Sequence, residues 1–379
     1  MKLTQRSYKL GDEININKLY KLVAGIERNG PEFDWEWLDT WNGQGSMWLV
    51  FDEDREDGDR LIMQYSLIPT PFIFWGKSYL AGKTENCMCH PDYRGKGLYF
   101  PHERKYFEEA KKRFQIFFTT AGNATKGAPG AVRRKLGYNA LDSWIDFFFL
   151  TDIQYAREEM FSRLDNKPSL SAGVIKFFSY MMSWFVYAYF QTRTFKSANV
   201  KTALFDINNA PIGKIVEMWN RNKKFYGITV DRNRSYLSWR INQNPYFVYR
   251  YLTLYKDERL VGYIIFYLTK NNNLRIEDIL AEEKDSSIFV QLLAQMVLLA
   301  KREKVGAIVF STLKGNRILT EVFRKSGFLY KEALSIKNIF SKNKEENPFH
   351  VYISGSVPDF QKAYEPANWY ITGLVKEGR

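Results

Sequence analysis

A short loop that combines glycines with basic residues is the part of this sequence best suited to chemistry. It reads HPDYRGKGLY over residues 90–99 of a chain of 379 residues. Gly95 and Gly97 allow the backbone to turn tightly and allow a ligand to approach the main chain, while Arg94 and Lys96 add positive charge. A predicted strand precedes the loop and a predicted helix follows it, and a helix start has unpaired N–H groups. We therefore interpret the loop as an anion site suited to a pyrophosphate.

A second segment with a recognisable pattern follows the loop. Asn123 precedes a short predicted helix over residues 131–136, and Gly137 and Tyr138 come directly after this helix. Together the two segments resemble the acyl-CoA-binding motifs of the GNAT superfamily of N-acyltransferases, whose loop has the pattern Arg/Gln-x-x-Gly-x-Gly/Ala.

The match to the family's loop is partial. Arg94 and Gly97 occupy the first and fourth positions, whereas Tyr99 stands at the sixth, where glycine or alanine is usual. The resemblance implies acetyl-CoA or another acyl-CoA as the co-substrate. The residues that it implies for cofactor binding are Met88, Cys89, His90, Arg94, Gly95, Lys96, Gly97, Leu98, Tyr99 and Asn123.

The resemblance further implies direct transfer of the acyl group to an amine. The amine attacks the thioester carbonyl, backbone N–H groups near residues 88–90 polarise this carbonyl, and a base removes a proton from the amine. Glu85 lies on the same predicted strand and is the candidate base, although a carboxylate at the start of a strand can also be a plain surface group. His90 and His102 are alternative bases; a position before proline and a solvated helix position are their simpler interpretations.

The sequence leaves open which group protonates the leaving thiolate. Many GNAT enzymes use a tyrosine four residues before the glycine of the second motif, and this chain has Arg133 there. Tyr138 is our catalytic candidate instead, with Tyr99 and solvent as alternatives. Cys87 and Cys89 could in principle form an acyl-enzyme, although burial in a strand is the simpler interpretation.

The order of predicted elements, taken with the resemblance, indicates an α/β (α+β) fold with two GNAT-like domains. Each domain is expected to be a mixed, mostly antiparallel sheet flanked by helices. The sequence RKLGY at residues 134–138 returns as RKSGF at residues 324–328, which suggests an internal duplication. We predict an acyl-CoA-binding domain over residues 1–150, a helical connector over 151–199 and a degenerate second domain over 200–379.

The second half has no comparable anion loop. Residues 281–287 read AEEKDSS, with no glycine and with carboxylates that would repel a pyrophosphate. We interpret this half as a partner that shapes the acceptor site, with Trp239 and Arg240 as candidate substrate-binding residues. The alternative is that these two residues end a solvated helix. By analogy with related tandem proteins, an amino sugar of surface-polysaccharide synthesis is the expected small-molecule amine.

A strongly apolar stretch over residues 170–190 lies within the connector. About 20 apolar residues can span a bilayer, but this stretch contains Lys176 and several serines and tyrosines. We favour a helix buried between the domains. Peripheral contact with a membrane surface is the alternative, because basic residues flank the stretch.

Composition narrows the classes of function. The net charge of +13 suits a polyanionic ligand, and the aromatic content of 17% indicates large aromatic cores or binding surfaces. Two cysteines and three histidines argue against a disulfide scaffold and a cysteine-rich zinc site, so we predict no metal. The chain begins without an apolar signal segment, which favours a reduced, cytoplasmic setting.

Two other functions stay open at this stage. Fem-type tRNA-dependent aminoacyltransferases also have two GNAT-like halves, but the intact glycine loop favours CoA and makes nucleic acid an unlikely partner. A non-catalytic protein at a membrane surface is the other alternative. The sequence does not distinguish a monomer from a homodimer.

Overall fold

The computed structural model describes residues 2–56, 59–120, 128–154, 181, 184–185, 187–192, 201–330 and 347–376. The strands are β1 (Leu3–Ser7), β2 (Ser46–Asp52), β3 (Leu61–Phe74), β4 (Lys77–Thr84), β5 (Met88–Cys89), β6 (Ile116–Thr119), β7 (Asn139–Leu150), β8 (Lys201–Asp206), β9 (Ile228–Val230), β10 (Tyr249–Lys256), β11 (Arg259–Leu268), β12 (Asn273–Ala281), β13 (Ala307–Leu313), β14 (Leu329–Tyr330) and β15 (Pro348–Ile353). The α-helices are α1 (Glu13–Ala24), α2 (Gly30–Phe33), α3 (Tyr99–Ala110), α4 (Ala128–Lys135), α7 (Ile212–Asn222), α8 (Arg234–Leu237), α9 (Ser286–Arg302) and α10 (Arg317–Lys325).

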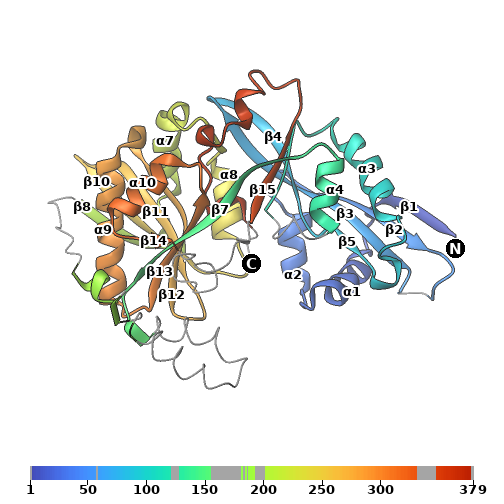
Figure 1. The fold of residues 1–379 in the computed structure, drawn as a ribbon, viewed down its shortest axis with the longest axis horizontal. Coiled ribbons are helices and arrows are strands. Elements are labelled where there is room, and N and C mark those ends of the chain that lie inside the picture. The colour runs from blue at the N-terminus through green and yellow to red at the C-terminus, as the bar shows by residue number, and fades with distance from the viewer. Residues whose placement is uncertain are drawn as a thin grey trace.

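These strands form one continuous sheet that spans both halves of the molecule (Figure 1). Its order is β1-β2-β3-β4-β6-β15-β7-β13-β12-β11-β10-β8. Among the described strands, only the pairs β4–β6 and β12–β13 are parallel. The predicted class, an α/β fold with a mixed and mostly antiparallel sheet, is therefore confirmed.

Helices cover both faces of the first half of the sheet. On one face, Tyr106 and Phe107 of α3 pack in one core with Phe117 of β6. On the other face, Ile16 of α1 belongs to the same core as Phe118. Because neighbouring residues of a strand point to opposite faces, β6 contributes to both cores.

β4 and β6 pair over a short distance and then separate. Their parallel register ends at Lys83, which is opposite Phe118. The chain then breaks at Asn86, whose φ is 46°, and β5 pairs with β3 instead. The strand predicted over residues 84–90 is therefore interrupted, because a residue in the left-handed region cannot continue a regular ladder.

β3 runs through two prolines at which the sequence predicts a break. Pro69 and Pro71 pair with β4 on one side. On the other side, the first residue of β2, Ser46, is opposite Leu67, and the last residue of β9, Val230, is opposite Phe72. The prolines lie in the gap between these two neighbours, where a missing N–H interrupts no ladder.

The second half contributes a strand to the first half of the sheet. β15 lies between β6 and β7, pairing with β6 through His350–Ile353 and with β7 through Pro348–Val351. β7 then continues past β15 and pairs with β13 through Trp144–Leu150. The boundaries that we place at residues 150 and 200 stay predictions, but the strands pair across them.

The structure repeats one unit in both halves. α3 leads from β4 and β5 to β6, and α9 leads from β12 to β13, in each case joining parallel neighbours. The repeated RKLGY and RKSGF sequences end helices in the same way. Gly137 and Gly327 have φ of 86° and 81°, and the N–H groups of Tyr138 and Phe328 donate to carbonyls five residues earlier. This αL helix end favours glycine.

Part of the connector is described. Phe190 is buried against Phe148 and Phe149, whereas Met181, Trp184 and Phe185 are 40, 54 and 65% exposed. Residues 170–180, 182–183 and 186 of the apolar stretch lie outside the described residues. Among the residues that are described, no helix is long and apolar enough to cross a membrane.

Candidate active site

The glycine loop has the predicted strand–loop–helix setting. It follows β5 and leads into α3, and Gly95 and Gly97 both have φ of 74°. A side chain would be strained at this φ, and no atom lies within 4 Å of a Cβ built on either glycine. The loop from Arg94 to Gly97 is exposed at the start of a 12-residue helix. It can therefore receive an anion through its backbone.

Tyr99 and His90 have structural partners. The Tyr99 hydroxyl lies 3.5 Å from the carbonyl oxygen of Gln64 on β3, so this unusual residue points towards the sheet and away from the loop. Leu98 precedes it and is half-buried. His90 is buried, and its Nδ1 accepts a hydrogen bond from the Asp92 N–H at 3.2 Å. This contact orders the turn before the loop.

One backbone N–H of β5 is directed away from β3. Hydrogen-bonded and non-hydrogen-bonded pairs alternate in an antiparallel ladder. The His90 N–H donates to the Ile62 carbonyl at 2.8 Å, so the next pair, Cys89 with Met63, has its N–H and C=O turned outward. The Cys89 carbonyl indeed accepts from Arg94 Nε at 3.1 Å. Of residues 88–90, Cys89 is thus placed to donate to a ligand, while the N–H groups of Met88 and His90 face β3.

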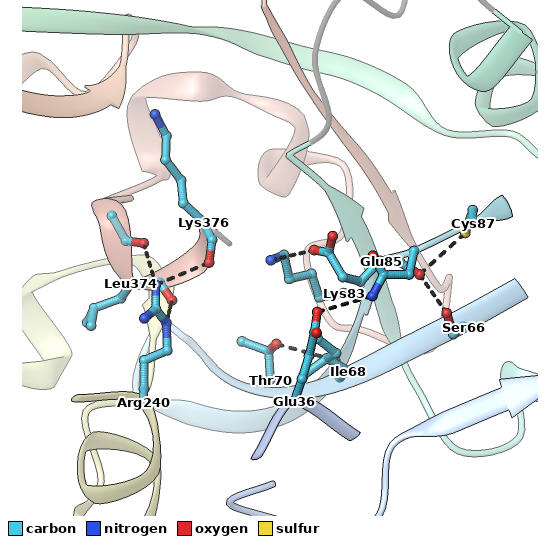
Figure 2. Close-up of polar contacts among 12 residues, drawn as sticks. Glu36, Ser66, Ile68, Thr70, Lys83, Glu85, Cys87, Arg240, Leu374 and Lys376 are labelled. Carbon is cyan, nitrogen blue, oxygen red and sulfur yellow. Dashed lines mark hydrogen bonds and ion pairs between the residues drawn. The ribbon is translucent and has the colours of Figure 1, made fainter. Parts of the chain in front are cut away.

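Glu85 is buried, with 6% of its surface exposed. Its Oε2 lies 2.7 Å from Nζ of Lys83, a residue equally buried and two positions earlier in the chain (Figure 2). Successive side chains alternate along a strand, so both residues share one face of the sheet. The interpretation of Glu85 as a surface carboxylate is therefore wrong.

Glu85 and Lys83 line a partly enclosed pocket formed by both halves of the chain. The cavity itself is small, about 20 Å³, and it opens to solvent. The residues that line it are Trp35, Glu36, Ile68, Thr70, Lys83, Glu85, Tyr236, Trp239, Arg240, Tyr246, Leu374, Val375 and Lys376. The structure thus brings together the candidate base and both candidate substrate-binding residues, which are far apart in the sequence.

Two matching turns build the aromatic wall of this pocket. Trp35 lies in a π-helical turn (Asp34–Leu38) and Trp239 in another (Ser238–Asn242). The two rings stack with centroids 5.1 Å apart, and each indole N–H donates to the other residue's carbonyl, at 2.9 and 2.8 Å. An asparagine caps the helix before each turn, Asn29 before α2 and Asn233 before α8. The internal duplication therefore includes the two turns whose tryptophans line the pocket.

Arg240 lines the pocket, but its observed partners belong to the protein. It is 2% exposed, and it ties the segment over residues 373–376 to the turn over residues 238–242 (Figure 2). Its guanidinium donates to Glu277 at 2.6 Å, to the Tyr249 hydroxyl at 3.3 Å, and to the carbonyls of Gly373, Leu374 and Lys376 at 3.4, 3.3 and 3.2 Å. Contact with substrate stays a prediction for Arg240.

Among the charged residues of the pocket, the sequence analysis missed Lys83, Glu36 and Lys376. Glu36 is buried and accepts from Arg28 at 2.7 Å and from Asn86 at 3.2 Å. The spacing of Lys83 and Glu85 on one strand face is a signal that could have been read. No local pattern marks Glu36, because its place in the pocket depends on packing against the second half.

Tyr138 lies behind β4, on the face covered by α3 and α4. Its hydroxyl is 3.3 Å from Oγ1 of Thr84, the neighbour of Glu85 that points to the opposite face. Burial raises the pKa of Tyr138 to about 12, so its hydroxyl carries its proton at neutral pH. Arg133 is buried beside it and forms an ion pair with Glu103 of α3.

Other candidates from the sequence have plainer settings. His102 is buried, and burial lowers its pKa to about 4, so it is a neutral core residue. Cys87 and Cys89 are half-buried, and burial raises the pKa of Cys89, which argues against an acyl-enzyme there. Asn123 lies outside the described residues. Within the described part of the chain, no group of His, Cys, Asp or Glu side chains could hold a metal ion.

The second half has a turn at the position of the glycine loop, but this turn lacks glycines and contains carboxylates that would repel an anion. Glu283 and Lys284 have φ of 51° and 58° before α9. The Glu283 N–H, at a place corresponding to the glycine loop, donates to Asn222 at 2.8 Å. Glu282 forms an ion pair with Arg259. Side chains of the protein thus contact this turn, which fits a degenerate copy.

Comparisons with known proteins identify the fold. No protein family model and no curated protein matches the sequence. An Enterococcus faecalis V583 protein described as a probable N-acyltransferase is 13% identical, with a TM-score of 0.61 over 92% of this chain and 73% of its own. A tandem GNAT protein from the clavulanic acid biosynthesis pathway is 12% identical, with a TM-score of 0.54 over 94% of this chain and 100% of its own. Saccharomyces cerevisiae N-myristoyltransferase with bound myristoyl-CoA is 11% identical, with a TM-score of 0.53 over 94% of this chain and 83% of its own. The chain therefore has the GNAT fold in its tandem form.

Proposed function

We propose that this protein is an acyl-CoA-dependent N-acyltransferase that transfers an acyl group, first of all acetyl, to the amine of a small molecule. The buried Glu85 carboxylate carries the proposal, because it lines a pocket between the two halves and lies shortly before the glycine loop in the chain. The tandem GNAT fold supports it. The neighbour with bound myristoyl-CoA supports an acyl-CoA as the second substrate.

In the proposed reaction the two substrates meet where β4 and β6 separate. The pyrophosphate of CoA binds the loop over residues 94–97, and the thioester reaches the segment after β4. The Cys89 N–H polarises the thioester carbonyl, and Glu85 removes a proton from the amine, directly or through water. Tyr138 supplies a proton to the thiolate from the other face, because its hydroxyl is protonated at neutral pH.

The pocket's composition supports an amino sugar or a similar polar ring as the acceptor. Trp35, Trp239 and Tyr246 present aromatic surface, and Glu36 and Glu85 present carboxylates. Aromatic rings stack on sugar rings, and carboxylates attract the ammonium form of an amine. We propose a primary amine on such a ring, without assigning its identity.

Calorimetry with acetyl-CoA tests the proposal. We expect binding to the wild-type protein and none to Gly97→Glu, because a carboxylate would enter the phosphate site. Gly76→Glu is the matched control, since Gly76 also has a positive φ, 84°, but lies in the β3–β4 turn. Equal affinity of the wild type and Gly97→Glu would show that the loop is misassigned. Binding of tRNA in place of acetyl-CoA would favour the aminoacyltransferase alternative.

Contact with a membrane surface is a further part of the proposal. Met181, Trp184 and Phe185 are helical residues with exposed apolar side chains, which suits insertion at a lipid interface. Co-sedimentation with anionic vesicles tests this contact. Equal sedimentation of the wild type and a Trp184→Ser, Phe185→Ser double variant would contradict it.

A further inference from the structure

The proposed acceptor pocket already contains an amine of the protein. Lys83 Nζ lies 2.7 Å from the Glu85 carboxylate, and the side chains of the two residues are 7% and 6% exposed. Lys83 is also the last residue of β4 paired with β6, so it lies at the point where the two strands separate. An amine beside a buried carboxylate at this point is what the proposed reaction requires of its acceptor.

Lys83 is not needed to neutralise the pocket's second carboxylate. Glu36 already accepts a hydrogen bond from the buried Arg28 at 2.7 Å. On the opposite wall, Arg240 is paired with Glu277 at 2.6 Å. Lys83 therefore has Glu85 as its ion-pair partner. The other lysine that lines the pocket, Lys376, is less buried, and its Nζ lies 3.9 Å from Asp146.

We propose that Lys83 is a self-acylation site: without a bound acceptor, the protein transfers the acyl group from acyl-CoA to Lys83 Nζ. This inference rests on the proposed function. It also implies that an acceptor and Lys83 compete for the same acyl group. The modification would remove the lysine's charge and leave an acyl group inside the acceptor pocket.

The covalent step balances without another reactant. The Lys83 ammonium first gives one proton to Glu85, which passes it to solvent. The neutral Nζ attacks the thioester carbonyl, the N–C bond forms, and the C–S bond breaks with its electron pair leaving on sulfur. The second proton from Nζ goes to the thiolate, so the products are an amide, free CoA thiol and one released proton.

Because Lys83 is buried, its acylation would distinguish transfer within the site from uncatalysed acylation in solution. Thioesters in solution acylate exposed lysines without catalysis, and Lys77 is an exposed lysine on the same strand. A buried lysine can be acylated selectively only by a thioester that is already bound beside it. Selective modification of Lys83 over Lys77 therefore separates transfer within the site from chemical background.

Mass spectrometry with acetyl-CoA provides the test. Calorimetry first establishes that acetyl-CoA binds. The purified full chain is then incubated with acetyl-CoA, its intact mass is recorded, and acetylated peptides are mapped. We expect one acetyl group per chain, on Lys83, and no such group in Lys83→Arg or in Gly97→Glu. Glu85→Gln should slow the modification about tenfold or more.

The outcomes separate the inference from the proposed function. If acetyl-CoA binds but Lys83 stays unmodified, self-acylation is overturned and the proposed function stays in place. The same holds if acetylation is found mainly on the most exposed lysines. No binding overturns both. Acetylation of Lys83 that persists in Gly97→Glu also overturns the inference, because it would not depend on the loop.

Discussion

At the scale of single residues, the candidate site depends on side-chain alternation at the end of β4. Lys83 and Glu85 point into the pocket between the halves, while Thr84 points to the other face and meets Tyr138 at 3.3 Å. The candidate base, Glu85, and the candidate acid, Tyr138, therefore lie on opposite faces of the sheet, with the backbone at the end of β4 between them. A thioester held where β4 and β6 separate could be reached by one group from each face.

Glu85→Gln tests the base. We expect kcat with acetyl-CoA and an accepted amine to fall about 100-fold or more, because the amide cannot accept the proton, while the affinity for acetyl-CoA stays unchanged. Steady-state kinetics and calorimetry measure the two effects. Glu109→Gln is the control, since Glu109 is an exposed carboxylate of α3 that does not line this pocket. Unchanged turnover in a folded Glu85→Gln protein would remove Glu85 as the base.

His102 predicts a pH dependence of stability. Burial lowers its pKa to about 4, whereas the unfolded chain has the ordinary value of 6.5. Between pH 4 and pH 6.5 the unfolded state binds more protons than the folded state, so the free energy of unfolding increases with pH. The protein therefore loses stability as the pH falls from 6.5 towards 4. The loss amounts to about 3 kcal/mol at most.

Urea unfolding at pH 7 and pH 5 measures this loss, with His102→Gln as the comparison. The variant should lose less stability between the two pH values than the wild type does. His350 is also buried with a lowered pKa and contributes in the same direction, so the variant should retain some pH dependence. An identical pH dependence in both proteins would contradict the assignment to His102.

At the scale of elements, a turn present in two copies builds the pocket wall. α2 with its π-helical turn and α8 with its own place Trp35 and Trp239 against each other. Each indole N–H donates a hydrogen bond to the backbone carbonyl of the other tryptophan, so the contact combines hydrogen bonds with ring stacking. The wall consequently fixes the distance between the halves at the pocket.

Trp239→Ala tests this contact. The variant should lose about 3–5 kcal/mol of stability, as is typical of large-to-small changes at buried tryptophans, and its KM for the amine should rise. Trp184→Ala is the control, because Trp184 is 54% exposed and its loss should stay within about 0.5 kcal/mol. Chemical denaturation measures both. Equal small losses would mean that the stacked pair does not hold the halves together.

At the scale of the whole molecule, β15 crosses from the second half into the first half of the sheet. It fills the position between β6 and β7 and contributes the buried Phe349 and Val351 to the core shared with α1. The strand that completes the first half of the sheet thus comes from residues 348–353. The two halves are expected to fold together.

A fragment over residues 1–150 tests this expectation. It lacks β15 and leaves unpaired strand edges on β6 and β7, which favours aggregation. We expect no cooperative thermal transition by circular dichroism. Fusing residues 347–354 behind residue 150 through a flexible linker should restore part of the transition. Cooperative unfolding of the unmodified fragment would show that β15 is dispensable for the first half.

Local patterns predicted the parts of the site that depend on neighbouring residues. The positive φ of Gly95 and Gly97 and the helix start after them agree with the predicted loop. The repeated RKLGY and RKSGF sequences each have their glycine, Gly137 and Gly327, at a positive φ after a helix. The prediction was wrong at Pro69 and Pro71, where the gap between β2 and β9 accommodates the prolines. That gap involves strands distant in the sequence, so no local pattern signals it.

By itself the sequence determined the class of fold and the glycine loop with the helix after it, because these depend on periodicity and short-range backbone preferences. The tertiary structure alone decided that Glu85 is buried beside Lys83, that Trp239 meets Trp35 across 204 residues, and that Arg240 holds the segment over residues 373–376. Such contacts depend on how distant surfaces fit together. Contacts between residues far apart in the chain leave no periodic pattern in the sequence, so the sequence alone could not predict them.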